Sequence, residues 1–269
     1  MCMVSLGKPV ALGRTAEIYA WEQGQILKLF WEWFSADGVE HEARIAHAVH
    51  AAGLPVPAVG EVVEVNGRLG LIYERVEGPS MFEAIVARPW TLLRSARLLA
   101  QVQADVHARG IVPELPSQRE RLENKIRAAE ALPPDLQKAA LKALGKMPDG
   151  SRLCHGDFHP GNVLMAARGP IIIDWIDATY GNPLADIVRS SLLIRGAAAG
   201  GSLAGWRMKT MVRWYHATYL RRCFQLRPGD QQQFAAWQPI VAAARLSENI
   251  LEEQDWLLSL VRAGLAKGD

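Results

Sequence analysis

Residues 153–164 read LCHGDFHPGNVL, and residues 171–175 read IIIDW. The first stretch is a polar loop between two apolar segments, and the second is a strand-like run that ends in a carboxylate. Asp157 and Asn162 are separated by four residues on this loop, and Asp174 follows after one hairpin. Two carboxylates and an amide oxygen that converge there would form an oxygen-only site, which is the ligand set that Mg²⁺ prefers.

The first quarter of the chain has the pattern of a small antiparallel sheet. Residues 25–30 (QILKLF) form a short apolar run with one lysine inside it. Asn66-Gly67 lies between the Val/Ile-rich runs 61–65 and 68–75, which is a strong hairpin signal. Residues 40–53 carry apolar side chains at helical spacing and end in Gly53, which predicts one helix beside the sheet.

The pattern changes after Glu77-Gly78-Pro79, which predicts a turn or linker. From there the chain is expected to be mainly helical, apart from residues 151–177, which contain the polar loop and the strand-like runs quoted above. The expected helices cover residues 90–109, 117–132 and 134–144, and three long segments after Pro183.

Composition and charge exclude several classes of protein. The chain has 269 residues, of which 49% are hydrophobic and 22% charged, so it can bury a core without metals or disulfides. A net charge of +2 argues against a dedicated nucleic-acid-binding protein. The most apolar stretch, 189–205, contains Arg189 and Arg195, so we expect no transmembrane helix and no membrane partner.

Cysteine content and the N-terminal residues indicate the compartment. Three cysteines, Cys2, Cys154 and Cys223, are far apart and cannot all pair. The first ten residues lack the long apolar run of a signal peptide. Both features favour a reducing, cytoplasmic location.

The loop and the following aspartate resemble the catalytic loop and metal-binding segment of kinases. HGDFHPGN followed by IIDW is the form found in the aminoglycoside phosphotransferase and choline kinase-like group of small-molecule kinases, and the order of elements fits over nearly the whole chain. The resemblance implies an α+β, bilobal protein kinase-like fold. Its N-lobe, a small antiparallel sheet plus helix, would cover residues 1–76, its hinge 77–80, and its larger, mostly helical C-lobe 81–269.

The resemblance also implies roles for the chemical groups. Asp157 would accept the proton of the attacking hydroxyl, and Asn162 and Asp174 would hold Mg²⁺ against the phosphates of ATP, with GTP left open as a donor. Lys28 would neutralise phosphate charge and would be positioned by Glu42, although Glu40 is nearby on the same expected helix.

Three further positions would contact the nucleotide. The backbone at Glu74 and Val76 would pair with adenine, with Tyr73 just before them, and Gly13 lies where this group has its phosphate-covering loop. The full double-glycine kinase pattern is absent around Gly13.

The same resemblance gives supporting residues. His155 and Asp186 would brace the catalytic loop, and His159 stands where protein kinases usually carry a lysine. Asp177 is expected either to be structural or to face the acceptor.

The sequence therefore predicts an ATP-dependent O-phosphotransferase that acts on a hydroxyl of a small molecule. Aminoglycosides, sugars, amino alcohols and other metabolites stay open as acceptors, and so does the oligomeric state. A non-catalytic nucleotide-binding protein and a protein kinase are the alternatives, but the segment between Asp174 and Pro183 is too short for a peptide platform and no Ala-Pro-Glu follows.

Charged residues near the C-terminus give two alternatives for the acceptor pocket. The acidic cluster Glu248, Glu252, Glu253 and Asp255 would either line an acidic pocket or form a solvated helix face, whereas the neighbouring segment 213–227 is basic.

Overall fold

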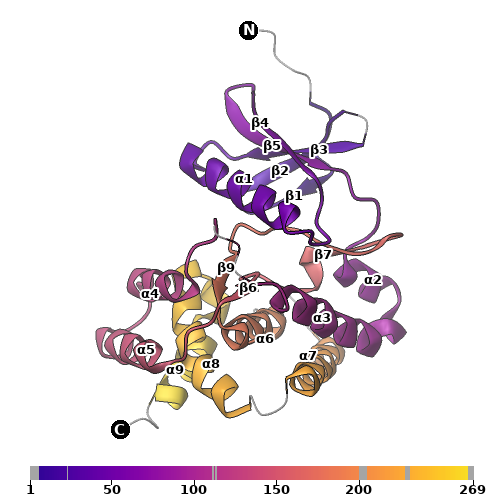
Figure 1. Cartoon of the computed structure of the whole chain (residues 1–269). Helices are drawn as coiled ribbons and strands as arrows, with labels where there is room; N and C mark the ends of the chain where they lie inside the picture. Colours follow the sequence, from indigo (N-terminus) through magenta and orange to yellow (C-terminus); the bar gives the residue numbers. More distant parts are fainter. Residues whose placement is uncertain are drawn as a thin grey trace. The chain divides into compact units, whose positions relative to one another are not determined.

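A computed structural model describes residues 6–22, 24–110, 112, 114–199, 205–227 and 231–265 (Figure 1). Contacts between residues divide the chain into two compact units. Unit 1 consists of the chain up to Met81 together with Gly161–Ile176, and unit 2 consists of Phe82–Pro160 and the chain from Asp177 onward. The N-lobe, hinge and C-lobe boundaries given above stay a prediction.

Unit 1 is built on a five-stranded antiparallel sheet, as the sequence predicts. Its spatial order is β1-β2-β3-β5-β4. The strands are β1 (Ala11–Leu12), β2 (Ala16–Ala20), β3 (Gln25–Phe30), β4 (Val59–Val65) and β5 (Arg68–Glu74). Asn66 and Gly67 connect β4 to β5 with φ of 52° and 80°, so both turn residues adopt the positive φ that a tight hairpin requires.

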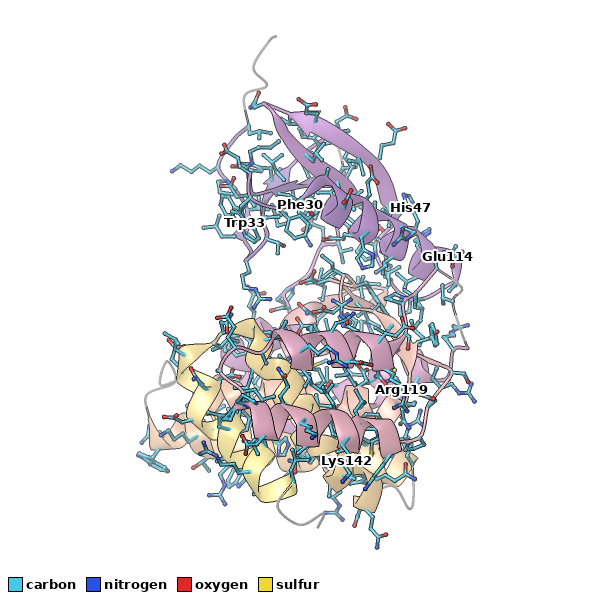
Figure 2. All side chains as sticks on the ribbon, turned by 90° about the vertical axis from the view of Figure 1, so that its left-hand side faces the viewer. Phe30, Trp33, His47, Glu114, Arg119 and Lys142 are labelled. Atoms are coloured by element: carbon cyan, nitrogen blue, oxygen red, sulfur yellow. The ribbon has the colours of Figure 1, made fainter. Side chains whose placement is uncertain are left out.

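One helix, α1 (Ala36–Ala51), packs on this sheet. Ser35 caps its N-terminus, because its hydroxyl accepts a hydrogen bond from the Gly38 N–H at 3.1 Å. Val39 and Ala43 join Phe30 of β3 (labelled in Figure 2) in one core cluster. Leu27 and Leu29 belong to a different cluster, so successive β3 side chains alternate between the two faces of the sheet.

A second hairpin completes unit 1. It joins β7 (Val163–Ala166) to β8 (Gly169–Ile172), and Val163 lies opposite Ile172. Asn162 precedes β7, and its carbonyl accepts a hydrogen bond from the Ile173 N–H at 3.0 Å. Asn162 and Asp174 are therefore brought to the same open end of this hairpin.

Unit 2 is mostly helical. Its helices are α2 (Met81–Ala87), α3 (Leu92–His107), α4 (Gln118–Ala128), α5 (Pro134–Lys146), α6 (Pro183–Ala199), α7 (Trp206–Leu226), α8 (Gln231–Arg245) and α9 (Leu251–Leu265). β6 (Arg152–Cys154) and β9 (Thr179–Gly181) form a short antiparallel pair. The side chain of Arg119 (Figure 2) fastens α4 to the end of α5 by donating to the carbonyl oxygens of Leu144 and Met147.

The expectation of three long helical segments after Pro183 is wrong, because the described residues form four helices there. The last break is a 3₁₀ turn at Leu246–Glu248 followed by Asn249, whose left-handed φ of 52° ends the turn before α9 begins. Asn is one of the few residues that adopt this conformation readily, so it separates α8 from α9.

Two further expectations concern the membrane and the thiols. The described helices include none that is both long and apolar enough to cross a bilayer. Cys154 and Cys223 are buried free thiols, and Cys2 lies outside the described residues.

The same substitution, glycine to alanine, should have opposite effects on stability at two positions, because the backbone conformation differs between them. Gly67→Ala should destabilise the protein by about 1 kcal/mol, because alanine is strained at positive φ. Gly145→Ala should stabilise it by about 0.5 kcal/mol, because Gly145 lies within α5 and a Cβ there meets nothing within 4 Å. Urea denaturation of both variants checks this, and a Gly67→Ala protein as stable as the wild type would contradict the hairpin geometry.

Candidate active site

A buried ion pair joins β3 to α1 in unit 1. Lys28 Nζ lies 2.6 Å from Glu42 Oε1 and 3.2 Å from Asp174 Oδ1. Tyr73 of β5 donates its hydroxyl to the same Glu42 oxygen at 3.0 Å. Lys28 follows Leu27 and precedes Leu29, so the alternation of the strand turns its side chain to the α1 face. The structure thus brings Lys28, Glu42 and Asp174 together.

The α1 helix explains why Glu42, and not Glu40, meets the lysine. Glu42 lies between the core residues Val39 and Ala43 and is 3% exposed, whereas Glu40 is exposed. Burial alone would lower the pKa of Lys28, but the carboxylates of Asp174 and Glu42 outweigh it and raise that pKa. The ammonium therefore keeps its positive charge in a buried place, as a group that neutralises phosphate must.

The oxygen donors at the end of the β7–β8 hairpin fit a divalent cation. Asn162 contributes an amide and Asp174 a carboxylate, and these are hard oxygen ligands of the kind that Mg²⁺ takes. Asp174 adopts φ of 64°, and its side chain is 42% exposed. Its backbone conformation and exposure leave it accessible to a metal while one oxygen faces Lys28.

The remaining nucleotide-binding candidates also lie in unit 1. Gly13 occupies the turn between β1 and β2, where its N–H bonds to the Ala16 carbonyl at 2.8 Å. The carboxylate of Glu74 at the end of β5 takes a two-point contact from Arg168 at 2.6 and 2.9 Å. This guanidinium lowers the pKa of Glu74. Val76 is half-buried, and adenine pairing at Glu74 and Val76 stays a prediction.

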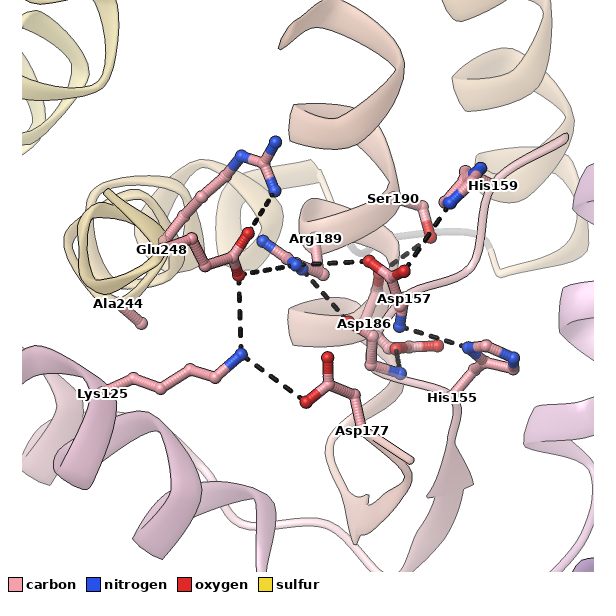
Figure 3. A network of polar contacts seen from close by, with 12 residues as sticks. Lys125, His155, Asp157, His159, Asp177, Asp186, Arg189, Ser190, Ala244 and Glu248 are labelled. Atoms are coloured by element: carbon pink, nitrogen blue, oxygen red, sulfur yellow. Dashed lines mark hydrogen bonds and ion pairs between the residues drawn. The ribbon is translucent and has the colours of Figure 1, made fainter. Parts of the chain in front are cut away.

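The predicted catalytic base, Asp157, lies in unit 2 within a cluster of basic groups (Figure 3). Arg189 Nη2 lies 3.2 Å from its Oδ1, and His159 Nε2 lies 3.6 Å from its Oδ2. The Asp157 N–H bonds to Nδ1 of the fully buried His155 at 3.2 Å. Burial works in the opposite direction, but His159, Arg189 and His155 together hold the pKa of Asp157 far below its usual range. The carboxylate of Asp157 is therefore ionised, as the predicted role of proton acceptor requires.

Asp186 fastens the catalytic loop, as the resemblance implies. Its Oδ1 accepts the Gly156 N–H at 2.7 Å, and its Oδ2 accepts hydrogen bonds from His107 at 2.8 Å and Gln103 at 2.9 Å. Gly156 adopts φ of 79°, and a Cβ at this position would overlap the Asp177 carbonyl oxygen. The loop is consequently held on α6 and α3 from directly beside Asp157.

A pocket next to this loop is lined by charged side chains from α4, α6 and α8. Arg121 forms an ion pair with Asp177, and Lys125 lies 3.7 Å from the same carboxylate oxygen. Glu248 pairs with Arg189 at 2.7 Å and with Arg245 at 3.0 Å. Burial and the field of Arg189 lower the pKa of Lys125 to about 8.

The ion pairs in and near this pocket decide between the alternatives that the sequence left open for Asp177 and the C-terminal acidic cluster. Asp177 lines the pocket but is already paired with Arg121. The C-terminal cluster does not act as one surface, since Glu248 and Glu253 point inward and pair with Arg245, while Glu252 and Asp255 are exposed. Glu248 and Glu253 therefore do not belong to a solvated helix face, so that alternative is wrong for them. Glu252 and Asp255 do not line this pocket, so the alternative of an acidic pocket is wrong for these two residues.

Sequence reasoning missed the cations of unit 2. Arg189 follows Asp186 by three positions, so both lie on the same face of α6, and that spacing could have identified it. Arg121 and Lys125 are four apart on α4 and share a face in the same way. In unit 1, Arg168 lies in the turn between β7 and β8 and carries no comparable signal.

With this geometry in place, comparisons with known proteins define the family. The model of the phosphotransferase enzyme family matches residues 26–217, which is more than half of the chain. The protein belongs to this family and is a phosphotransferase. No curated protein sequence matches it.

Solved structures show that the fold is kinase-like. A thermostable mutant of aminoglycoside phosphotransferase APH(4)-Ia, in complex with AMP-PNP and hygromycin B, has a TM-score of 0.67 at 17% identity, with 97% of this chain and 93% of that chain covered. Amicoumacin kinase hAmiN, in complex with AMP-PNP, Ca²⁺ and Ami, has a TM-score of 0.63 at 15% identity, with coverage of 97% and 88%. A putative fructosamine-3-kinase from Haemophilus somnus 129PT has a TM-score of 0.61 at 14% identity, with coverage of 96% and 90%.

Asp186 predicts a distinct acid sensitivity. Its hydrogen bonds from His107, Gln103 and Gly156 outweigh burial and lower its pKa to about 2. A carboxylate whose pKa is lower in the folded state than in the unfolded state stabilises the fold at pH values above the unfolded-state pKa. This stabilisation is lost as the pH falls from about 4 to about 2. Between pH 5 and pH 2 the wild type should lose about 2 kcal/mol more unfolding free energy than Asp186→Asn. Parallel stability–pH curves for the two proteins would contradict the assignment.

Proposed function

We propose that this phosphotransferase transfers the γ-phosphate of ATP to a hydroxyl group of a small molecule. The observation that carries the proposal is the buried Lys28, which is held 2.6 Å from Glu42 and 3.2 Å from Asp174. A strand lysine fixed by a helix glutamate beside a metal-binding aspartate is the arrangement that phosphoryl transfer uses to neutralise phosphate charge.

Unit 1 supplies the nucleotide-binding groups in this proposal. Lys28 would contact the α- and β-phosphates, with Gly13 near the phosphates, and the backbone of Glu74 and Val76 would pair with adenine. Asn162 and Asp174 would hold Mg²⁺, which would supply further neutralisation of phosphate charge when bound. Two of the structural neighbours contain AMP-PNP, which supports ATP as the donor.

Unit 2 supplies the base. The acceptor oxygen would attack the γ-phosphorus and form a new O–P bond, and the bond from that phosphorus to the bridging β-oxygen would break to release ADP. The ionised carboxylate of Asp157 would accept the hydroxyl proton. Positioning and charge compensation carry most of this reaction, so the residues present are sufficient in kind.

The alternatives are weaker on residues of this chain. A non-catalytic nucleotide-binding protein usually lacks one of the key groups, whereas Lys28, Asp157, Asn162 and Asp174 are all present. The short segment that follows Asp174 disfavours a peptide acceptor. We place the reaction in the cytoplasm, where thiols such as those of Cys154 and Cys223 stay reduced.

Asp157→Asn should separate chemistry from nucleotide binding. We expect kcat to fall by about 10² or more, because the proton acceptor is lost, while the Kd for ATP–Mg²⁺ changes little. The assay is ADP formation with a panel of aminoglycosides, sugars, amino alcohols, hydroxy acids and nucleosides, alongside nucleotide titration. Equal losses in turnover and nucleotide affinity would assign Asp157 a structural role.

Asp174→Asn should show the converse behaviour. Loss of a charged metal ligand beside Lys28 should weaken ATP–Mg²⁺ binding by about tenfold or more. Calorimetry with and without Mg²⁺ measures this effect, and Asp157→Asn is the control that leaves the metal pair intact. Unchanged nucleotide affinity in Asp174→Asn would remove Asp174 from the metal site.

A further inference from the structure

The charged pocket of unit 2 lies beside the predicted catalytic base. It is lined by side chains of α4, α6 and α8, and it reaches Gly156, the residue before Asp157. Sites for small molecules are concave and have a few convergent polar groups that orient the ligand. Arg189 connects the pocket to the base, since its guanidinium contacts both Glu248 in the lining and Asp157 (Figure 3).

The carboxylates of this pocket are already engaged by the protein. Asp177 is paired with Arg121, and Glu248 is paired with Arg189 and Arg245. Asp186 is fully occupied by His107, Gln103 and the Gly156 N–H. An ammonium group entering the pocket would therefore compete with an internal donor at each of these three lining carboxylates.

The cations, in contrast, have donors to spare. Lys125 has three N–H donors but only one long hydrogen bond, to Glu248 at 3.5 Å, and its contact to Asp177 is longer still at 3.7 Å. Arg121 has five N–H donors, and its Nε is buried without a hydrogen-bond partner. Both side chains are 27% exposed, so a molecule from solvent can reach them.

We propose that this pocket binds an anionic group of the acceptor, a carboxylate or a phosphate or sulfate ester, at Arg121 and Lys125, with the acceptor hydroxyl directed toward Asp157. The acceptor is then a hydroxylated acid and not a polycation such as an aminoglycoside. This inference rests on the proposed function, and it names the substrate class for the same site.

Two further properties of the pocket agree with an anionic ligand. The lining holds four cationic side chains and three carboxylates, namely Arg121, Lys125, Arg189 and Arg245 against Asp177, Asp186 and Glu248. The lowered pKa of Lys125 reflects burial and repulsion from Arg189, and a bound anion would relieve that repulsion.

Inorganic sulfate is a suitable probe because it needs neither nucleotide nor turnover. In calorimetric titrations at pH 7 and constant ionic strength, the wild type should bind sulfate saturably in the millimolar range. Lys125→Met should weaken this binding by about tenfold or more, because one charge-assisted hydrogen bond is lost. Lys142→Met is the matched control, since Lys142 (Figure 2) is an exposed lysine of α5 outside the lining and its loss should change nothing.

Two further titrations use the wild-type protein, so their results do not depend on whether a variant folds. Spermine, a polycation, should not bind in the pocket, and saturating AMP-PNP–Mg²⁺ should leave the sulfate affinity unchanged within twofold. Absence of saturable sulfate binding, equal binding by Lys125→Met, or spermine binding that Asp177→Asn weakens would each overturn the inference. Displacement of sulfate by the nucleotide would also overturn it, because the cations would then serve the phosphates of ATP.

These outcomes are separable from the proposed function. A protein that binds sulfate through Lys125 but never consumes ATP would keep the anion pocket and lose the kinase activity. A protein that phosphorylates a polycation and ignores sulfate would keep the kinase activity and lose the anionic acceptor.

Discussion

The carboxylate of Asp186 is fully buried, and its hydrogen bonds determine where the catalytic loop lies. A buried charge costs several kcal/mol unless every oxygen is satisfied. Here one oxygen accepts the Gly156 N–H, and the other accepts hydrogen bonds from His107 and Gln103 of α3. These bonds join α3, α6 and the catalytic loop at one point, and Asp157 follows Gly156 directly.

Ion pairs in buried or half-buried surroundings also place the other charged groups of the candidate site. In unit 1, Lys28 is placed by two carboxylates that come from α1 and from the end of the β7–β8 hairpin. In unit 2, Arg189 lies between Asp157 and Glu248 and also donates to the Gly156 carbonyl at 3.1 Å. The first set suits phosphate and metal, and the second suits a proton acceptor beside a small-molecule pocket.

The sequence predicted the parts that depend on local patterns. The Asn66-Gly67 hairpin, the strand around Lys28 and the helix carrying Glu42 follow from turn chemistry and periodicity, and the structure has each of them. The catalytic loop was recognisable because its spacing within eight residues is distinctive.

What the sequence could not predict depends on contacts between distant elements. Lys125 and Glu248 are 123 residues apart in the sequence. Their contact depends on α4 lying beside the end of α8, which no local pattern predicts. Runs of charge such as 248–255 look alike whether they face solvent or an arginine, so the inward orientation of Glu248 and Glu253 required the structure. The number of helices after Pro183 was predicted wrongly, and the turn that separates α8 from α9 contains a single left-handed Asn, which leaves no periodic signal.

In the proposed reaction a phosphate ester forms on an acceptor hydroxyl, with Asp157 as the base. ³¹P NMR of the protein with ATP, Mg²⁺ and a pool of hydroxylated small molecules tests it most directly. We expect a new phosphomonoester signal, coupled to the proton of the phosphorylated carbon, that grows as ADP appears and is absent with Asp157→Asn. Formation of ADP with inorganic phosphate alone, or an ester signal of equal size with Asp157→Asn, would contradict it.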